Sequence, residues 1–318
     1  MTKPLLLLWI DGAEPYARAI AAAGLADRLR IETVPRAATP DPALLAEAEA
    51  LLSWGPPAGV LDRMPKLRFI QSLTAGVEHW LGRADLREDI ALSCARGTHR
   101  VQMPENILGA LFHITKPYAA IVADNAAKRW TRRVSTTLAG STLGILGLGA
   151  IGAELARKAA ALEMRVIGTK RDGAAVPHVE KVFAPDGTDA VLAQSDFVVL
   201  LLPATPETDN FIDAARLARM KKTAWLLNFG RGALIKDDDL VAAVRAGTIT
   251  GAVLDVFRTE PLPAESPYWG EDGILVLPHI GGLHPERDGM VAALMVENLR
   301  RFLDGAAPSQ LVDRRAGY

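Results

Sequence analysis

The sequence contains a single cysteine, Cys94, so no disulfide bond can form within the chain. A nucleophilic role for this thiol would need a nearby base, and nothing in the sequence indicates one. Cys94 follows the apolar run 89–93, which favours a small buried thiol. One unpaired cysteine also fits a protein of a reducing compartment.

Long hydrophobic runs are also missing. The N-terminal run 4–10 (PLLLLWI) is far shorter than the roughly 20 residues of a membrane helix. It lacks the basic region and the small-residue cleavage site of a signal peptide. A buried first strand explains it better. We therefore expect a cytoplasmic, unexported protein without a membrane partner.

Neither sign of charge dominates, since 36 Lys and Arg face 37 Asp and Glu. This balance excludes a general attraction to nucleic acid. No pair among the six histidines has the spacing of a zinc site, so no metal is predicted. At roughly 100–200 residues per domain, 318 residues suggest two domains.

Strand-like and helix-like segments alternate along both halves of the chain, which predicts two parallel α/β sheets. The expected strands of the first half are 5–10, 30–34, 50–54 and 67–72. Those of the second half are 143–146, 165–169, 196–202, 224–228, 251–256 and 274–277. The expected helices are 14–24, 104–123, 153–162 and 286–303.

A glycine-rich loop follows the predicted strand 143–146 and opens the helix 153–162. Its residues are Gly147, Leu148, Gly149, Ala150, Ile151 and Gly152, which fit G-x-G-x-x-G. In this position Gly147 permits a tight turn, Gly149 lets a pyrophosphate approach the backbone, and Gly152 allows close helix–strand packing. The helix N-terminus offers N–H groups to the anion. The loop predicts a dinucleotide site.

The end of the next strand distinguishes between the two nicotinamide cofactors. NAD sites place an acidic residue there for the ribose 2′-hydroxyl. This chain has Lys170 and Arg171 instead, which favour a 2′-phosphate. Asp172 comes next and could take the place of the acid if it turned inward. We predict NADP(H) as the preferred cofactor, with NAD(H) as the alternative.

Three segments that follow predicted strands each carry one ionisable side chain. They are 228–232 (NFGRG) with Arg231, 254–263 (LDVFRTEPLP) with Glu260, and 277–282 (LPHIGG) with His279. The carboxyl ends of parallel strands meet at one edge of a sheet, so we expect the three groups to lie near one another. Taken one at a time, each has a simpler interpretation: Arg231 as a surface residue, Glu260 as part of a turn and His279 as a structural histidine. Together with the glycine loop they indicate a catalytic site.

These motifs resemble those of the D-2-hydroxyacid dehydrogenase family, and the resemblance covers nearly the whole chain. Segment 202–208 (LPATPET) is similar to the family's cofactor segment, and 74–77 (TAGV) is similar to its substrate loop. Segments 54–57, 260–267 and 312–318 look closest to the bacterial glyoxylate/hydroxypyruvate reductases. The resemblance implies two doubly wound parallel-sheet domains with an interdomain cleft. It implies a flavodoxin-like substrate domain of residues 1–103 and 285–318, and a Rossmann-type cofactor domain of residues 104–284.

The resemblance also implies roles for individual residues. Arg231 would hold the substrate carboxylate and ketone oxygen, His279 would be the general acid, and Glu260 would hydrogen-bond His279 and stabilise its charged form. Backbone N–H groups of Ala75 and Gly76 would grip the carboxylate, beside Trp54 as a pocket wall. Asp255 would orient the nicotinamide amide. The residues expected to line the cofactor cleft are Leu202, Pro203, Thr208 and Gly281.

The implied reaction is the NADPH-dependent reduction of glyoxylate to glycolate, or of hydroxypyruvate to D-glycerate, by a homodimer. Trp130 is a candidate for the dimer interface. One alternative keeps the fold and takes a bulkier or phosphorylated 2-ketoacid, which would need extra cations in its pocket. Another is a nucleotide-sensing regulator similar to the family's transcriptional corepressors, although long basic or disordered flanks are missing.

Overall fold

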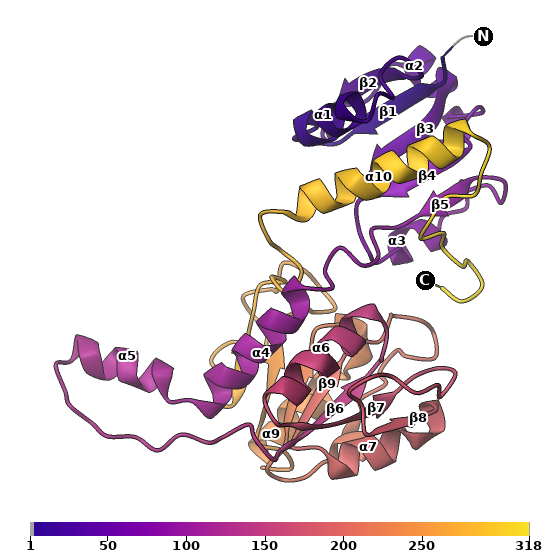
Figure 1. Ribbon diagram of the computed structural model, residues 1–318. Helices are drawn as coiled ribbons and strands as arrows, with labels where there is room; N and C mark the ends of the chain where they lie inside the picture. The colour runs from indigo at the N-terminus through magenta and orange to yellow at the C-terminus, as the bar shows by residue number, and fades with distance from the viewer. Residues whose placement is uncertain (1–2, 318) are drawn as a thin grey trace. The chain divides into compact units, whose positions relative to one another are not determined.

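The computed structural model describes residues 3–317, which form two compact units with one parallel sheet each (Figure 1). The first unit comprises the chain up to Thr98 and the chain from His284 onward, and the second is His99–Leu283. The junctions expected from the sequence, after residues 103 and 284, lie close to these positions. The first unit is therefore built from both ends of the chain, and the second is inserted between them.

The first unit has five parallel strands in the order β2-β1-β3-β4-β5. The strands are β1 (Leu5–Trp9), β2 (Arg30–Val34), β3 (Ala48–Ser53), β4 (Phe69–Ser72) and β5 (Ala91–Ser93). The helices are α1 (Glu14–Ala22), α2 (Pro42–Glu47), α3 (Glu78–Leu81) and α10 (Arg287–Leu303). Side chains alternate along a strand, so Leu6 and Leu8 pack with α1 and α10 while Leu5 and Leu7 pack with α2 and α3. Apolar residues on both faces explain the continuous apolar run of β1.

A buried polar network attaches α10 and the C-terminal segment to this sheet. The Nδ2 of Asn298 donates to Gln71 Oε1 on β4 and to Ser93 Oγ on β5, both at 2.9 Å. Its Oδ1 accepts from the backbone N–H of Ser309 at 2.7 Å. Each polar group is satisfied, so the network fixes where the returning chain lies.

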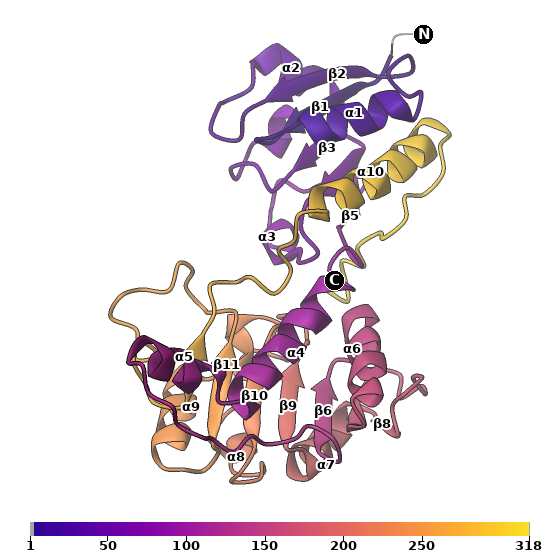
Figure 2. The same ribbon diagram turned by 60° about the vertical axis from the view of Figure 1, so that its left-hand side comes forward.

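The second unit has seven parallel strands in the order β12-β11-β10-β9-β6-β7-β8 (Figure 2). They are β6 (Thr142–Leu146), β7 (Arg165–Thr169), β8 (Lys181–Phe183), β9 (Phe197–Leu200), β10 (Trp225–Asn228), β11 (Gly251–Leu254) and β12 (Ile274–Val276). One face packs against α4 (Gln102–Thr115) and α6 (Ala150–Ala161). The other packs against α7 (Thr188–Gln194), α8 (Ala214–Leu217) and α9 (Asp237–Arg245). The strand order reverses between β6 and β9, which is where such sheets bind nucleotides.

The prediction of one long helix over 104–123 is wrong, because the structure has two helices there. α4 ends at Thr115 and α5 (Tyr118–Ala126) follows after a break. Lys116 has an extended backbone, with φ −110° and ψ 141°. The following residue is Pro117, and a proline disfavours helical backbone in the residue before it. The expected strands and helices otherwise occur, with ends that differ by a few residues.

Two further strands, β5 and β8, were not expected. Each has three residues and lies at an edge of its sheet. Edge strands are often this short and need no continuous apolar run, so they leave little trace in a sequence.

Cys94 is fully buried, which confirms its interpretation as a packed thiol. Burial raises the pKa of the Cys94 thiol, so it is poorly suited to act as a nucleophile. Among residues 3–317, no helix combines the length and the apolar character of a membrane-spanning segment.

Candidate active site

The register of three neighbouring strands brings the predicted catalytic segments to one edge of the seven-stranded sheet. β10 pairs with β11 so that Asn228 lies opposite Leu254, and β11 pairs with β12 so that Leu254 lies opposite Val276. All three strands therefore end at the same level. Arg231, Glu260 and His279 lie in the loops that follow these strand ends.

His279 and Glu260 are in direct contact. The Nδ1 of His279 lies 2.6 Å from Glu260 Oε2. The other oxygen, Oε1, accepts from the backbone N–H of Phe257 at 2.9 Å, which fixes the carboxylate. A carboxylate at Nδ1 selects the tautomer with its proton there and orients the ring. Nε2 remains for a second partner, and 53% of the His279 side chain is exposed.

The backbone around His279 is held from both sides. Asp255 accepts from the N–H groups of Ile280 at 2.8 Å and Gly281 at 2.9 Å, one with each carboxylate oxygen. Asn106 on α4 donates to the carbonyl oxygens of the same two residues, at 3.1 and 3.0 Å. His279 itself has φ +54°, a left-handed conformation that non-glycine residues seldom adopt. Such a conformation persists where its surroundings enforce it, and it is common at functional sites.

Asp255 occupies a buried position, and burial raises the pKa of its carboxyl group. The two backbone N–H groups of Gly281 and Ile280 oppose that shift, since they stabilise the carboxylate. Asp255 lies beside the predicted cofactor residue Gly281, and its hydrogen bonds here are to the backbone of the histidine loop. The structure thus shows Asp255 as the anchor of that loop.

The loop of Arg231 packs against the loop of Glu260. A Cβ atom added at Gly232 would lie 2.0 Å from the carbonyl carbon of Phe257, so only glycine permits this approach. Asn228 shapes the turn: its Oδ1 accepts from Gly230 N–H at 3.1 Å and its Nδ2 donates to Arg231 O at 2.9 Å. The half-buried Arg231 carries a planar guanidinium, which suits a carboxylate.

The glycine loop fits a dinucleotide pyrophosphate. Gly147 has φ +110°, and a Cβ added there would lie 2.9 Å from the carbonyl carbon of Leu201 after β9. At Gly152 an added Cβ would lie 2.5 Å from Gly147 O, so the first turn of α6 packs tightly on the loop. At Gly149 an added Cβ would meet no atom within 4 Å. Of these three positions, only Gly149 faces open space, as the approach of a phosphate requires.

The N-terminus of α6 can supply the donors for that phosphate. Gly149 is the N-cap, and no side chain of the described chain caps the helix there. The N–H groups of the first helical turn lack intrahelical acceptors and attract an anion. Leu148, Ala150 and Ile151 complete the loop and this first turn. The residues present therefore fit the pyrophosphate of a dinucleotide.

The predicted 2′-phosphate residues form one turn after β7. Lys170 Nζ lies 2.9 Å from the Asp172 carboxylate, which also accepts from Ala174 N–H at 3.0 Å. The hydrogen bond from Lys170 lowers the pKa of Asp172. Asp172 is thus engaged within its own turn, and Arg171 is exposed beside it.

The segment after β9 folds into a compact loop next to Gly147. The Thr208 hydroxyl donates to Pro203 O at 2.7 Å and accepts from Thr205 N–H at 2.8 Å. Leu202 and Pro203 begin this loop. Thr208 therefore shapes the expected cofactor wall by closing the loop on itself.

The predicted substrate residues outside this edge belong to the first unit, where they also follow strand ends. Trp54 comes directly after β3, and Ala75 and Gly76 follow β4. Within residues 3–317, the N–H groups of Ala75 and Gly76 have no hydrogen-bond acceptor. Thr74 Oγ1 donates to Gly76 O at 2.6 Å and holds this loop. Consecutive N–H groups of this kind suit a carboxylate.

Two positioning residues were not identified from the sequence. Asn228 ends an apolar strand, and a polar residue at that point is a signal that could have been used. Asn106 lies on a helix that gives no sign of contact with residues 280–281, more than 170 positions away. Only the folded chain shows this contact.

Comparison with known proteins agrees with this geometry. Residues 108–281 match the family described as "D-isomer specific 2-hydroxyacid dehydrogenase, NAD binding domain". A glyoxylate/hydroxypyruvate reductase B of Citrobacter koseri is 32% identical over 303 residues, which cover 90% of this chain and 89% of that protein. The chain belongs to the D-isomer specific 2-hydroxyacid dehydrogenase family. This confirms the resemblance seen in the sequence, and the protein is an NAD(P)-dependent oxidoreductase of that family.

Two further relatives show the range within the family. An (S)-sulfolactate dehydrogenase of Chromohalobacter salexigens is 32% identical over 250 residues, which cover 77% of this chain and 80% of that protein. A crystal structure of a D-isomer specific 2-hydroxyacid dehydrogenase of Xanthobacter autotrophicus Py2, in complex with NADPH and MES, is 31% identical. Its TM-score is 0.86, and the alignment covers 100% of both chains. The predicted fold of two parallel α/β domains is confirmed.

Gly149→Ala tests the fit of the dinucleotide. The added methyl group meets no protein atom, so the melting temperature should stay unchanged. It would occupy the approach of the pyrophosphate, so the dissociation constant for NADPH should rise about tenfold or more. Calorimetry measures both. The control is Gly109→Ala, at an exposed position of α4, where an added Cβ also meets nothing within 4 Å. Unchanged NADPH binding by Gly149→Ala would place the nucleotide elsewhere.

Proposed function

We propose that this dehydrogenase reduces small 2-ketoacids, glyoxylate and hydroxypyruvate among them, with NADPH as the preferred donor and His279 as the general acid. The observation that carries the proposal is the 2.6 Å hydrogen bond between Glu260 and His279 Nδ1. It leaves Nε2 as the ring nitrogen for the substrate. The contact between the Arg231 loop and the Glu260 loop adds a guanidinium to the same edge.

In this proposal each residue has one chemical task. Arg231 holds the substrate carboxylate and ketone oxygen through its planar fork. Bound NADPH supplies the hydride that the carbonyl carbon accepts. His279 gives the Nε2 proton to the carbonyl oxygen as negative charge develops there. Glu260 balances the positive charge of the imidazolium and keeps the ring in one orientation.

The preference for NADPH rests on the turn after β7. Lys170 and Arg171 place two cations where an NAD site has its acid. Asp172, the residue that could replace that acid, is engaged with Lys170 and with the N–H of Ala174. The relative of Xanthobacter autotrophicus that was crystallised with NADPH supports the same choice.

We also propose a homodimer formed through the segment 118–134, which begins with α5. α5 and the chain after it extend from the rest of their unit (Figure 1). Trp130 and Val134 are 93% and 97% exposed, far beyond ordinary surface residues of their kind. Asp124 is buried and pairs with Arg129 at 3.0 Å and Arg133 at 2.7 Å, so the segment has a defined shape. A second copy of this chain is the occupant, since symmetric pairs are the commonest oligomers.

Replacement of the acid tests the catalytic role. His279→Ala should lower kcat with hydroxypyruvate roughly 10²–10⁴-fold while NADPH binding stays near normal. Steady-state assays at the nicotinamide absorbance and NADPH titrations measure the two effects. His113→Ala, an exposed histidine on α4, is the control. Full turnover by His279→Ala would refute the assignment.

Charge reversal after β7 tests the cofactor preference. Lys170→Asp combined with Arg171→Ala should lower the NADPH/NADH ratio of kcat/KM by about tenfold or more, because charged hydrogen bonds to the 2′-phosphate are lost. The control is Lys222→Asp with Arg219→Ala. These two residues precede β10, at the amino-terminal ends of the strands, on the side of the sheet away from the proposed cofactor site. A ratio that does not move would show that this turn does not bind the phosphate.

Added charge on the segment 118–134 tests the dimer. Trp130→Asp with Val134→Asp should convert the protein from dimer to monomer in size-exclusion chromatography with light scattering, since a buried unpaired charge opposes association. Ala242→Asp, on the exposed side of α9, should leave the mass unchanged. A wild-type monomer, or a double variant that remains dimeric, would contradict the proposal.

A further inference from the structure

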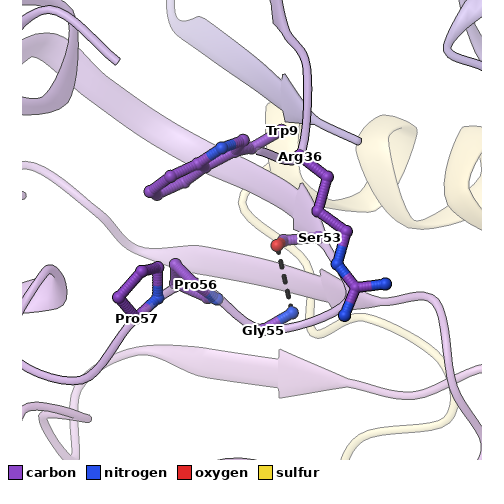
Figure 3. A pocket seen from close by; sticks show the side chains of 6 residues that line it. All are labelled: Trp9, Arg36, Ser53, Gly55, Pro56 and Pro57. Carbon is purple, nitrogen blue, oxygen red and sulfur yellow. Dashed lines mark hydrogen bonds between the residues drawn. The ribbon is translucent and has the colours of Figure 1, made fainter. Parts of the chain in front are cut away.

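A cavity of about 290 Å³ lies at the carboxyl edge of the five-stranded sheet. The residues that line it are Trp9, Arg36, Ser53, Gly55, Pro56 and Pro57 (Figure 3). Trp9 ends β1 and Ser53 ends β3, and these two strands are neighbours. The strand order reverses between β1 and β3, so the cavity occupies the switch point where open α/β sheets bind ligands. None of the roles assigned above uses it.

The charge in this cavity comes from Arg36. Within residues 3–317, its guanidinium forms no ion pair with a carboxylate. Asp11 is the nearby acid, and its Oδ1 accepts from the backbone N–H of Arg36 at 3.0 Å, not from the guanidinium. Figure 3 shows the guanidinium extending towards Gly55. The Ser53 hydroxyl accepts from Gly55 N–H at 3.1 Å and keeps its own proton to donate. The cavity thus presents donors for an oxyanion.

The cavity adjoins the loop proposed to bind the substrate carboxylate. Ser53 on β3 lies opposite Ser72 on β4, and Leu73 N–H donates to Ser53 O at 3.2 Å. The loop with Ala75 and Gly76 comes directly after β4. It therefore begins one strand away from Ser53, about 5 Å across the sheet. A small molecule held by that loop can therefore reach the cavity with its other end.

Two guanidinium groups lie near the Trp54 ring. Arg36 lies 6.0 Å and Arg287 lies 4.6 Å from the centre of the Trp54 ring. The buried Arg287 also donates to Leu73 O, just before the carboxylate loop, and pairs with Asp288 at 2.7 Å. One arginine therefore ties Trp54 to the loop, and the other faces the cavity. A guanidinium that faces an aromatic ring keeps its N–H groups for hydrogen bonds.

We propose that this cavity is a subsite for a second acidic group on the substrate: a carboxylate, sulfonate or phosphate at the end remote from the keto group. The inference rests on the proposed function, and it adds a preference, within the small 2-ketoacids, for those that carry a second acidic group. Arg36 is the specificity-determining residue, with Ser53 as an additional donor. A monoanionic ketoacid leaves Arg36 in water, whereas a dianion gains a charged hydrogen bond there.

The test compares ketoacids that differ in one acidic group. Oxaloacetate is paired with 2-ketobutyrate, which has the same chain length, and 3-sulfopyruvate and 3-phosphohydroxypyruvate are paired with hydroxypyruvate. In the wild type, kcat/KM for the favoured dianion should exceed that of its partner by about tenfold or more. Arg36→Gln should remove this excess and leave the monoanions unchanged. Arg36→Lys should keep part of it, because lysine retains the charge without the planar fork.

Arg18→Gln, an exposed arginine on α1, is the matched control and should behave as the wild type. A wild type without any preference for dianions overturns the subsite. The subsite is also overturned if Arg36→Gln lowers kcat/KM equally for both members of each pair. The three acidic groups in the panel identify which oxyanion fits.

Failure of the proposed function gives a different result: no ketoacid is reduced with either nucleotide. In that case the binding of a dianionic hydroxyacid tests the subsite. Titration with 3-sulfolactate, followed by quenching of tryptophan fluorescence, should show saturable binding that Arg36→Gln abolishes and Arg18→Gln retains. Binding that does not depend on Arg36, or none at all, overturns the subsite as well.

Discussion

The parallel register of β10, β11 and β12 is the constraint on which the catalytic edge depends. Asn228, Leu254 and Val276 lie level across the sheet, so the three loops after them start at one height. Arg231, Glu260 and His279 span almost fifty positions of the sequence, yet short loops after these strands are enough to bring them together. A shift in this pairing would separate Glu260 from His279, because their 2.6 Å hydrogen bond joins two of these loops.

Several contacts convert this coarse placement into a defined geometry. The buried carboxylate of Asp255 holds the N–H groups after His279, and Asn106 holds the carbonyl groups. Together they enforce a left-handed backbone at His279 that the residue would not adopt alone. Glu260 then fixes the ring. The imidazole is therefore positioned before any substrate arrives, which is how such sites reduce the cost of reorganisation.

The sequence predicted those features that leave local patterns and missed those that depend on distant contacts. The glycine loop, the strand ends and the apolar strands have local signatures, and the structure places them as expected. The break before Pro117 was misjudged because the apolar pattern continues through it. Asn106 could not be found, since its partners lie on a loop remote in sequence. The engagement of Asp172 with Lys170 depends on side-chain directions in one turn, which the order of residues leaves open.

A crystal structure of the protein with NADPH and oxamate, an unreactive analogue of a small 2-ketoacid, would show directly whether His279 faces the keto group. We expect the oxo oxygen of oxamate to lie within hydrogen-bond distance, roughly 2.6–3.2 Å, of His279 Nε2. We also expect the guanidinium of Arg231 to contact the same ligand and Glu260 to stay on Nδ1. An analogue bound with its oxo oxygen away from His279 would rule out His279 as the general acid.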